Sequence, residues 1–249
     1  MIKFENTEVL GWEHAIRGAR NPLNSWDRSD TVSCDDMETC AECPHIDDRG
    51  KCDFKPYVTI PPIIGPNDYD LMKRLRNAGT DHRKFMRMIT VYVDITAPLY
   101  FWKEHDQYKV GTTTNSCSTM HKIHAKEFTI DDFSHEHLTQ LSLANLKNTI
   151  NTLNYYRNTY LYGGEDLLED GSKVTYEPKS KDIWWQMIQL LPSSYNQRRT
   201  VMLNYEVLAN MYKSRKNHKL DEWHVFCDWI RGLPYSELIT GEFKEETHD

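Results

Sequence analysis

A polar stretch with many candidate ligand-binding side chains, residues 109–124 (KVGTTTNSCSTMHKIH), directly follows a hydrophobic part of the chain. Its hydroxyl, amide and imidazole groups can hydrogen bond to a phosphate or to the edge of a nucleobase. The same residue types are typical of polar loops with Ser/Thr turns and helix caps. The stretch is therefore either a polar loop or one wall of a ligand pocket, and Asn115 and Ser118 are the candidates for binding.

Four of the six cysteines lie close together with the spacing C-x5-C-x2-C-x8-C: Cys34, Cys40, Cys43 and Cys52. A C-x2-C pair with two flanking cysteines can bind zinc tetrahedrally, and His45 is a fifth candidate ligand. The outer spacings are not those of a standard zinc finger. Three hypotheses stay open: a structural zinc, a reduced surface loop, and a disulfide pair, which a reducing cytosol disfavours.

Cys117 raises the question of a nucleophile, because a thiolate can attack an electron-poor ring. His121 is the one neighbour in sequence that could activate it. The alternative is a cysteine that only packs, and this is the interpretation we favour.

The bulk composition excludes two classes of protein. A net charge of −7 argues against a protein that coats nucleic acid, since such proteins need a dominant basic surface. No apolar run approaches the ~18 residues of a membrane span, and the N-terminal residues lack the apolar centre of a signal peptide. We therefore expect a cytoplasmic protein with no membrane partner.

The pattern of apolar residues and breakers predicts strands early in the chain and helices late, which is typical of an α+β domain. We expect one domain over residues 1–249, with a Cys-rich insertion at about 30–66. The expected strands are 85–95 and 108–112, and 163–180 is expected to be an acidic loop. Thr96 is expected to cap a helix with Pro98 in its first turn. The expected helices are 8–20, 67–79, 97–106, 133–162, 181–191, 200–217 and 220–233.

The last third of the chain contains a spaced series of polar residues. Pro192 is followed twelve residues later by Asn204, six further on by Asn210, and five beyond that by Arg215. Two earlier segments accompany this series: "TDHRKF", which follows the helix ending in Gly79, and "ITAPLYFWKEHDQYKVGTTTNSCSTMH". In this order, the three segments resemble the flavin-dependent thymidylate synthases, also called thymidylate synthase complementing proteins. The resemblance covers residues 67–125 and 183–230.

The resemblance implies a fold, a reaction and a set of site residues. The fold is α+β, with a twisted, mainly antiparallel sheet flanked by helices, assembled as a homotetramer with sites between subunits. The reaction is FAD-dependent transfer of a one-carbon group from methylenetetrahydrofolate to C5 of a pyrimidine deoxynucleotide (dUMP to dTMP, or a variant pyrimidine), with NADPH reducing the flavin and no enzyme nucleophile. The implied nucleotide-binding residues are Lys103, Glu104, Ser118 and Arg215. The implied flavin-binding residues are His82, Lys109, Asn115, Asn204 and Asn210.

The chain departs from the family pattern at charged positions. The family's Arg-His-Arg motif is "QYK" here, residues 107–109, and its Arg-Gln pair is Lys103-Glu104. Two further family arginines are replaced by Met120 and Ile188. Four basic residues could substitute for these arginines: Lys122, Lys126, Arg198 and Arg199.

These departures leave two further hypotheses open. A carboxylate at Glu104 only accepts hydrogen bonds, so it suits the exocyclic amine of cytosine better than uracil. The loss of arginines that grip phosphate also favours an alternative function, in which the chain is a catalytically silent nucleotide-binding or regulatory protein on the same fold.

Overall fold

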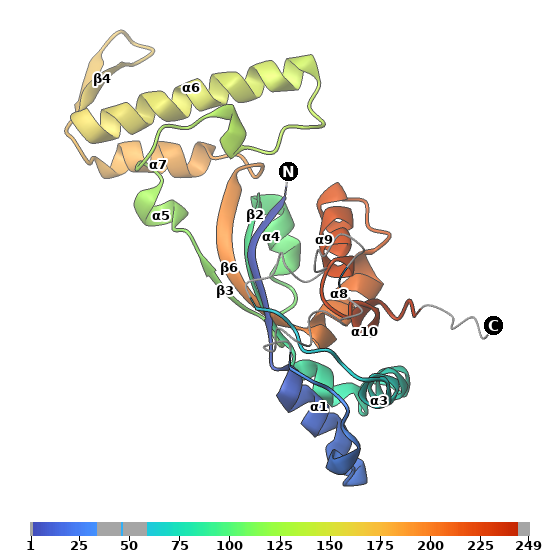
Figure 1. Ribbon diagram of the computed structural model, residues 1–249. Helices are drawn as coiled ribbons and strands as arrows, with labels where there is room; N and C mark the ends of the chain where they lie inside the picture. The colour runs from blue at the N-terminus through green and yellow to red at the C-terminus, as the bar shows by residue number, and fades with distance from the viewer. Residues whose placement is uncertain (1, 34–45, 47–58, 244–249) are drawn as a thin grey trace. The chain divides into compact units, whose positions relative to one another are not determined.

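The computed structural model describes residues 2–33, 46 and 59–243 (Figure 1). The chain divides into two compact units, each built from separate stretches of sequence. Unit 1 consists mainly of residues 96–105 and 116–199, and unit 2 of residues 2–95, 106–115 and 200–249. The division falls within three strands and does not separate consecutive domains, so the single domain stays a prediction. Among the helices that the structure describes, none has both the length and the apolar character needed to cross a membrane.

In the part of the chain that the structure describes, six strands form two sheets. Four of them are hydrogen bonded in the order β1-β2-β6-β3, with the bounds β1 Lys3–Leu10, β2 Thr90–Pro98, β6 Asn196–Asn204 and β3 Thr113–Ser116. The other two, β4 (Gly164–Leu167) and β5 (Lys173–Tyr176), form an antiparallel hairpin. The structure thus combines antiparallel sheets with helices, which confirms the predicted α+β fold with a mainly antiparallel sheet.

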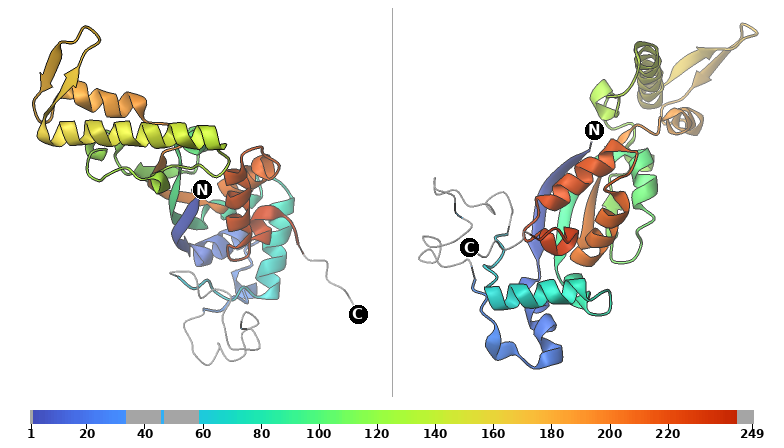
Figure 2. Two further views of the ribbon diagram at one scale, coloured as in Figure 1. Left: turned by 90° about the horizontal axis from the view of Figure 1, so that it is seen from above. Right: turned by 90° about the vertical axis from the view of Figure 1, so that its right-hand side faces the viewer.

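In unit 2, β2 has the alternation of a strand with one buried face. Val91, Val93 and Ile95 are fully buried, whereas Tyr92 between them is exposed. Among its described residues, this unit has the helices α1 Trp12–Arg20, η1 Asn21–Leu23, η2 Trp26–Arg28, α3 Pro66–Asn77, η3 Arg83–Arg87, α8 Tyr205–Arg215, α9 Asp221–Arg231 and α10 Glu237–Thr240. Two of them, α8 and α9, lie side by side in both figures (Figures 1 and 2).

The opposite face of the β2 and β6 strands carries polar side chains. One oxygen of the Asp94 carboxylate accepts a hydrogen bond from Thr200 on β6 at 2.6 Å, and the other accepts one from Asn6 on β1 at 2.9 Å. These bonds between strands fix the register of three strands on their exposed side.

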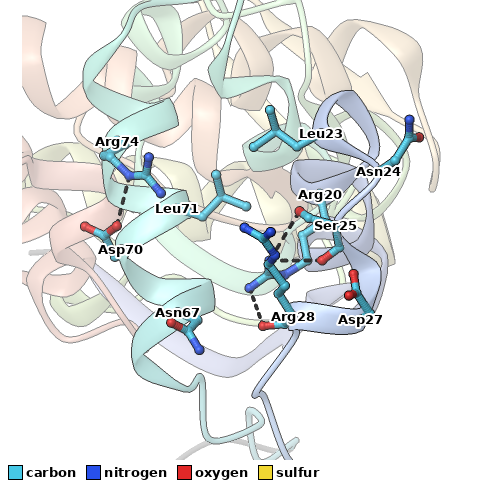
Figure 3. Close-up of a pocket in the computed structure, with 10 residues that line it drawn as sticks. All are labelled: Arg20, Leu23, Asn24, Ser25, Asp27, Arg28, Asn67, Asp70, Leu71 and Arg74. Carbon is cyan, nitrogen blue, oxygen red and sulfur yellow. Dashed lines mark hydrogen bonds and ion pairs between the residues drawn. The ribbon is translucent and has the colours of Figure 1, made fainter.

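A buried ion pair connects α1 to α3. Arg20 on α1 donates from Nε to Asp68 on α3. Its other two guanidinium nitrogens donate to the carbonyls of Ser25 and Arg28, as Figure 3 shows. The second carboxylate oxygen of Asp68 accepts hydrogen bonds from the Ser29 hydroxyl, from the backbone amides of Asp30 and Thr31, and from the Thr31 hydroxyl. These hydrogen bonds outweigh the cost of burial and lower the pKa of Asp68. Each guanidinium nitrogen of Arg20 donates a hydrogen bond within the protein. We therefore assign Arg20 a structural role, although it also lines a cavity of 610 Å³ (Figure 3).

Unit 1 contains α4 Leu99–His105, α5 Thr119–Lys122, η4 Ile130–Asp132, α6 Gln140–Tyr162 and α7 Lys181–Leu190. The long helix α6 packs along α7, and the β4–β5 hairpin follows the end of α6 (Figures 1 and 2). A hydrophobic core within unit 1 contains the buried residues Ile123, Phe128, Phe133, Leu146, Ile150, Leu153 and Met187. Apolar residues of α6, α7 and the segment before α6 therefore bury one another within this unit.

Several expected elements are wrong in type or position. Residues 108–112 do not form the expected strand, and the expected helix 133–162 begins only at Gln140. The predicted helix 8–20 begins only at Trp12, because Gly11 adopts a φ of +91° that separates it from strand β1. The predicted loop 163–180 contains the β4–β5 hairpin. The predicted helix 200–217 starts at Tyr205, since residues up to Asn204 belong to β6.

The expected helix cap at Thr96 is also wrong. Thr96 and Pro98 belong to β2, and the first amides of α4, those of Leu99 and Tyr100, donate to backbone carbonyls of residues 193 and 195. Asp68 does not cap α3, because its carboxylate binds Arg20. The carboxylate of Asp30 instead accepts from the first amides of that helix, at 2.8 and 3.0 Å.

Candidate functional site

Arg215, one of the expected nucleotide-binding residues, has a side chain whose orientation is fixed by several contacts. It is the last residue of α8, and its guanidinium lies 4.7 Å from the ring centre of Trp223 and 5.5 Å from that of Tyr108. Its Nε donates a 2.9 Å hydrogen bond to the Tyr108 hydroxyl. Two ring faces and one hydrogen bond therefore fix the orientation of a half-buried cation.

The loop that replaces the Arg-His-Arg motif packs along α8. Tyr108 contacts Arg215 at the C-terminal end of the helix, and Gly111 contacts Asn204 at its start. Lys109 lies between these two contacts in sequence and is exposed. Lys109 therefore belongs to a loop that contacts both ends of the helix that carries Asn204 and Arg215.

Asn204 has a clear structural role as the N-cap of α8. Its Oδ1 accepts from the Val207 amide at 2.9 Å, and its Nδ2 donates to the Gly111 carbonyl at 3.5 Å. Gly111 has a φ of +80°, and a Cβ there would lie 2.8 Å from Asn204 Nδ2. Glycine therefore permits both the backbone conformation and the close approach.

A second group of polar side chains lies between η3 and α8. Arg83 Nη2 donates to Asn210 Oδ1 at 3.0 Å, and Glu206 forms ion pairs with both Arg83 and Arg87. The hydrogen bond with Glu206 raises the pKa of Arg87. Two arginines around one carboxylate leave a net positive charge. This group includes Asn210, one of the expected flavin-binding residues. A second one, His82, directly precedes Arg83 in the sequence.

Arg83 contains a buried polar atom without a hydrogen-bond partner among the described residues. Its Nε is buried and lies 3.5 Å from a Glu206 carboxylate oxygen, in ion-pair contact but without a hydrogen bond. Buried N–H groups are nearly always satisfied by protein, water or ligand. This donor, with exposed His82 next to it, marks a place where an anionic group could bind.

In unit 1, the expected residues lie on α4 and at the start of α5. Lys103 and Glu104 are on α4, where the lysine is exposed and the glutamate is half-buried. Ser118 caps α5, its Oγ accepting from the His121 amide at 3.0 Å. Its hydroxyl proton remains a donor, so the capping role is compatible with phosphate binding.

A basic residue proposed as a substitute, Arg199, is held beside α4. Its guanidinium stacks 4.2 Å from the ring centre of Trp102, and its Nε donates to Gln197 Oε1 at 3.0 Å. Gln197 in turn donates to the Cys117 carbonyl at 2.9 Å. Cys117 is exposed. The contacts that fix the orientation of the Arg199 side chain could not be inferred from its sequence position alone.

Two groups of expected residues are not tested by these contacts. Asn115 is exposed on β3. The proposed metal ligands Cys34, Cys40, Cys43 and Cys52 lie outside the residues that the structure describes. Within the described ranges there is no group of three or more His, Cys, Asp or Glu side chains that could hold a metal ion.

No protein-family model and no curated protein matches the sequence. Solved structures do match. Two are of thymidylate synthase X (ThyX) from Helicobacter pylori with FAD and dUMP, at 14% identity and TM-scores of 0.56 and 0.57, covering 96% of this chain and 96% and 100% of theirs. A third is the UMP/dUMP methylase PolB from Streptomyces cacaoi bound with 5-Br dUMP, at 12% identity and a TM-score of 0.56, covering 98% of this chain and 96% of that one.

These similarities extend over almost the whole of each chain, so they concern the complete fold. They confirm, at the level of fold, the resemblance inferred from the three sequence segments. The chain has the α+β fold of these structures of flavin-dependent thymidylate synthase and of a UMP/dUMP methylase.

Proposed function

We propose that this chain is an FAD-dependent enzyme that transfers a one-carbon group from methylenetetrahydrofolate to C5 of a pyrimidine deoxynucleotide. NADPH would be the reductant of the flavin, and the active assembly would be a homotetramer. The proposal is supported by a fold shared over nearly the full length with structures that contain dUMP or 5-Br dUMP. It is also supported by site residues at the spacings of the family's third motif.

The observation that carries the proposal is the position of Arg215. In place of the missing Arg-His-Arg motif, the loop supplies Tyr108, whose hydroxyl and ring hold the guanidinium together with Trp223. A planar guanidinium with restricted rotation suits bidentate binding of phosphate. An arginine needed only for solubility at a helix end would not require two aromatic faces.

The η3 and α8 residues fit the anionic part of FAD. The unsatisfied Nε of Arg83, with His82 and Asn210 beside it, supplies donors and positive charge of the kind that a diphosphate requires. Lys109, Asn115 and Asn204 complete the proposed flavin set. Bound flavin would supply the redox chemistry, while these side chains orient it and compensate its charge.

The remaining proposed roles concern the nucleotide. Arg215, Ser118 and Lys103 would bind its phosphate, and Glu104 would accept from the base edge. Calorimetric titration with dUMP and dCMP tests the role of Glu104. We expect Glu104→Gln to shift the preference towards dUMP, and an unchanged ratio of affinities would refute a base contact.

Flavin binding provides the direct test of the proposed class. We expect the purified protein to be yellow, or to take up added FAD, with a bound flavin spectrum. Arg83→Gln should weaken FAD binding about tenfold, because a charged donor to phosphate is removed. Lys84→Gln is the matched control, since Lys84 is an exposed cation on the same short helix. Equal effects of the two substitutions would refute a specific role of Arg83.

A catalytically silent nucleotide-binding or regulatory protein is the second candidate function. The specific observation in its favour is the loss of arginines at residues 107–109, Met120 and Ile188. A colourless protein that binds a pyrimidine nucleotide but takes up no FAD would support it. Two further proposals are independent of that choice: sedimentation would test the homotetramer, and elemental analysis would test structural zinc at the four clustered cysteines.

A further inference from the structure

A cavity in unit 1 has a composition unlike that of an ordinary solvated surface. It has a volume of about 560 Å³ and is lined by Met120, His121, His124, Tyr160, Lys179, Lys181 and Trp184. Cavities that bind small molecules typically enclose about 300–1,000 Å³. The lining combines two lysines, two imidazoles and two large aromatic rings, and it includes no carboxylate. None of these residues belongs to the sets proposed for flavin or for the substrate nucleotide.

The aromatic walls of this cavity are fixed in place. Trp184 on α7 donates from Nε1 to the Met120 carbonyl at 2.9 Å. The rings of His124 and Tyr160 lie 4.8 Å apart between centres, and Arg157 donates to the His124 carbonyl at 3.0 Å. Rings held from several sides present a preformed surface for stacking on a flat ligand.

One polar atom on the cavity wall has no hydrogen-bond partner. His124 Nδ1 is buried and no group among the described residues donates to it or accepts from it. A buried ring nitrogen is normally hydrogen bonded by protein or by a ligand. Because His124 lines the cavity, a rotation of its ring would bring this nitrogen within reach of a ligand atom.

The cationic wall has an unusual backbone. Lys179 has a φ of +64°, in the left-handed region that side chains other than Gly, Asn and Asp seldom adopt. Its amide donates to the Tyr160 carbonyl at 2.7 Å, which holds this conformation. Strained backbone of this kind is often retained where a side chain must point into a site. Neither Lys179 nor Lys181 forms an ion pair with a described carboxylate.

From these four features we infer that the cavity is a second ligand site, for a flat heteroaromatic ring that carries an anionic group. Trp184 and Tyr160 stack on the ring, Lys179 and Lys181 bind the anion, and His124 Nδ1 hydrogen bonds to a polar atom of the ring. Two sources supply this chemistry: a nucleoside monophosphate and an aryl-glutamate of the kind found in folates. The inference does not depend on the proposed reaction, because it uses other residues.

The test is ¹⁹F NMR of the full chain labelled with fluorotryptophan, in which Trp184→Phe identifies the signal of Trp184. The probes are dUMP, p-aminobenzoylglutamate, uridine and inorganic phosphate. We expect dUMP or p-aminobenzoylglutamate to shift the Trp184 signal saturably, and the one that binds more tightly identifies the source. Uridine and phosphate, which each lack one part, should bind at least about tenfold more weakly.

Substitutions assign the shift to the cavity. Lys181→Gln should weaken binding about tenfold, whereas Lys147→Gln, at an exposed lysine of α6, should leave it unchanged. Lys179→Gly removes the second charge while suiting the left-handed backbone, so it should weaken binding without loss of folding. The inference fails if no probe moves the Trp184 signal, if phosphate binds as tightly as the complete ligand, or if the cavity variants bind like the control. Because the Trp184 signal reports on this cavity, failure here would leave FAD uptake as a separate test of the proposed function.

Discussion

Tyr108→Phe tests whether the loop at residues 106–112 positions Arg215 for binding. The substitution removes the 2.9 Å hydrogen bond between Arg215 Nε and the hydroxyl but keeps the ring on which the guanidinium stacks. Hydrogen bonds to charged groups contribute about 1.5–3 kcal/mol. Because Arg215 is only half-buried, we expect a contribution at or just below the lower end of this range, about 1–1.5 kcal/mol.

This magnitude predicts two measurable effects. Urea denaturation should show a loss of stability of about 1 kcal/mol, and calorimetry should show dUMP or dCMP bound about five- to tenfold more weakly, since 1.4 kcal/mol corresponds to a factor of ten. Tyr92→Phe is the control, because Tyr92 is an exposed tyrosine of the same unit. Nucleotide affinity within twofold of the unsubstituted protein, with the expected loss of stability, would show that Arg215 is held for structural reasons alone.

Three further predictions concern stability and reactivity. Asp68→Asn should cost about 3 kcal/mol, since it leaves a buried cation unpaired. Because the folded-state pKa of Asp68 is lowered, its contribution is present above its ordinary value of 3.8 and is lost as the pH falls through the lower folded-state pKa; denaturation curves at several pH values check both effects. Gly111→Ala should cost about 1–2 kcal/mol in the same assay, because of its positive φ and the contact with Asn204. Burial raises the pKa of Cys227 to about 11, so at pH 8 maleimide should label the exposed Cys117 and spare Cys227 until the protein unfolds, as peptide mapping would show.

Controls separate these causes from general damage. Gly79→Ala introduces a side chain at a φ of +109° with nothing within 4 Å, so it measures backbone strain without a contact. A loss of stability equal to that of Gly111→Ala would remove the role of the Asn204 contact. Asp70→Asn affects an exposed ion pair with Arg74 and should cost at most about 1 kcal/mol, so an equal loss in both Asp variants would contradict the argument from burial. Equal labelling of both cysteines in the folded protein would contradict the assigned burial of Cys227.

The spacing of Asn204, Asn210 and Arg215 identified candidate site residues only because it resembles the family motif, since intervals of six and five residues do not place the three side chains on one stripe of a helix. The start of α8 was less well predicted. Asn204 is a favourable N-cap residue, but the apolar residues of β6 before it continue into those of the helix, so the boundary between strand and helix was not visible.

The contacts that complete the candidate site could not be predicted. Tyr108 and Arg215 are separated by 107 positions, and Arg83 and Asn210 by 127. Local periodicity contains no information about such pairs, which depend on how the sheet and helices are assembled. The cation–π contact of Arg215 with Trp223 is closer in sequence, but it requires the turn between α8 and α9 that only the structure reveals.

Strand β1 and the β4–β5 hairpin were missed for a different reason. The β1 segment contains Asn6 at a φ of +53° and several charged residues, so it lacks the regular alternation of a half-buried strand. The hairpin strands are only half-buried or exposed, as for Leu167, and the acidic residues between them are typical of a loop. Strands that bury little apolar area leave little pattern in the sequence.

The most direct measurement of the proposed reaction is the release of tritium from C5 of a pyrimidine deoxynucleotide. The purified full-length chain, supplied with FAD, NADPH and methylenetetrahydrofolate, should release tritium from labelled dUMP or dCMP, and omission of the folate should abolish the release. Arg215→Gln should reduce the rate at low nucleotide concentration more than at saturation, since phosphate binding is lost. Protein that binds FAD and nucleotide but releases no tritium from either substrate would contradict the account and leave a nucleotide-binding protein on the same fold.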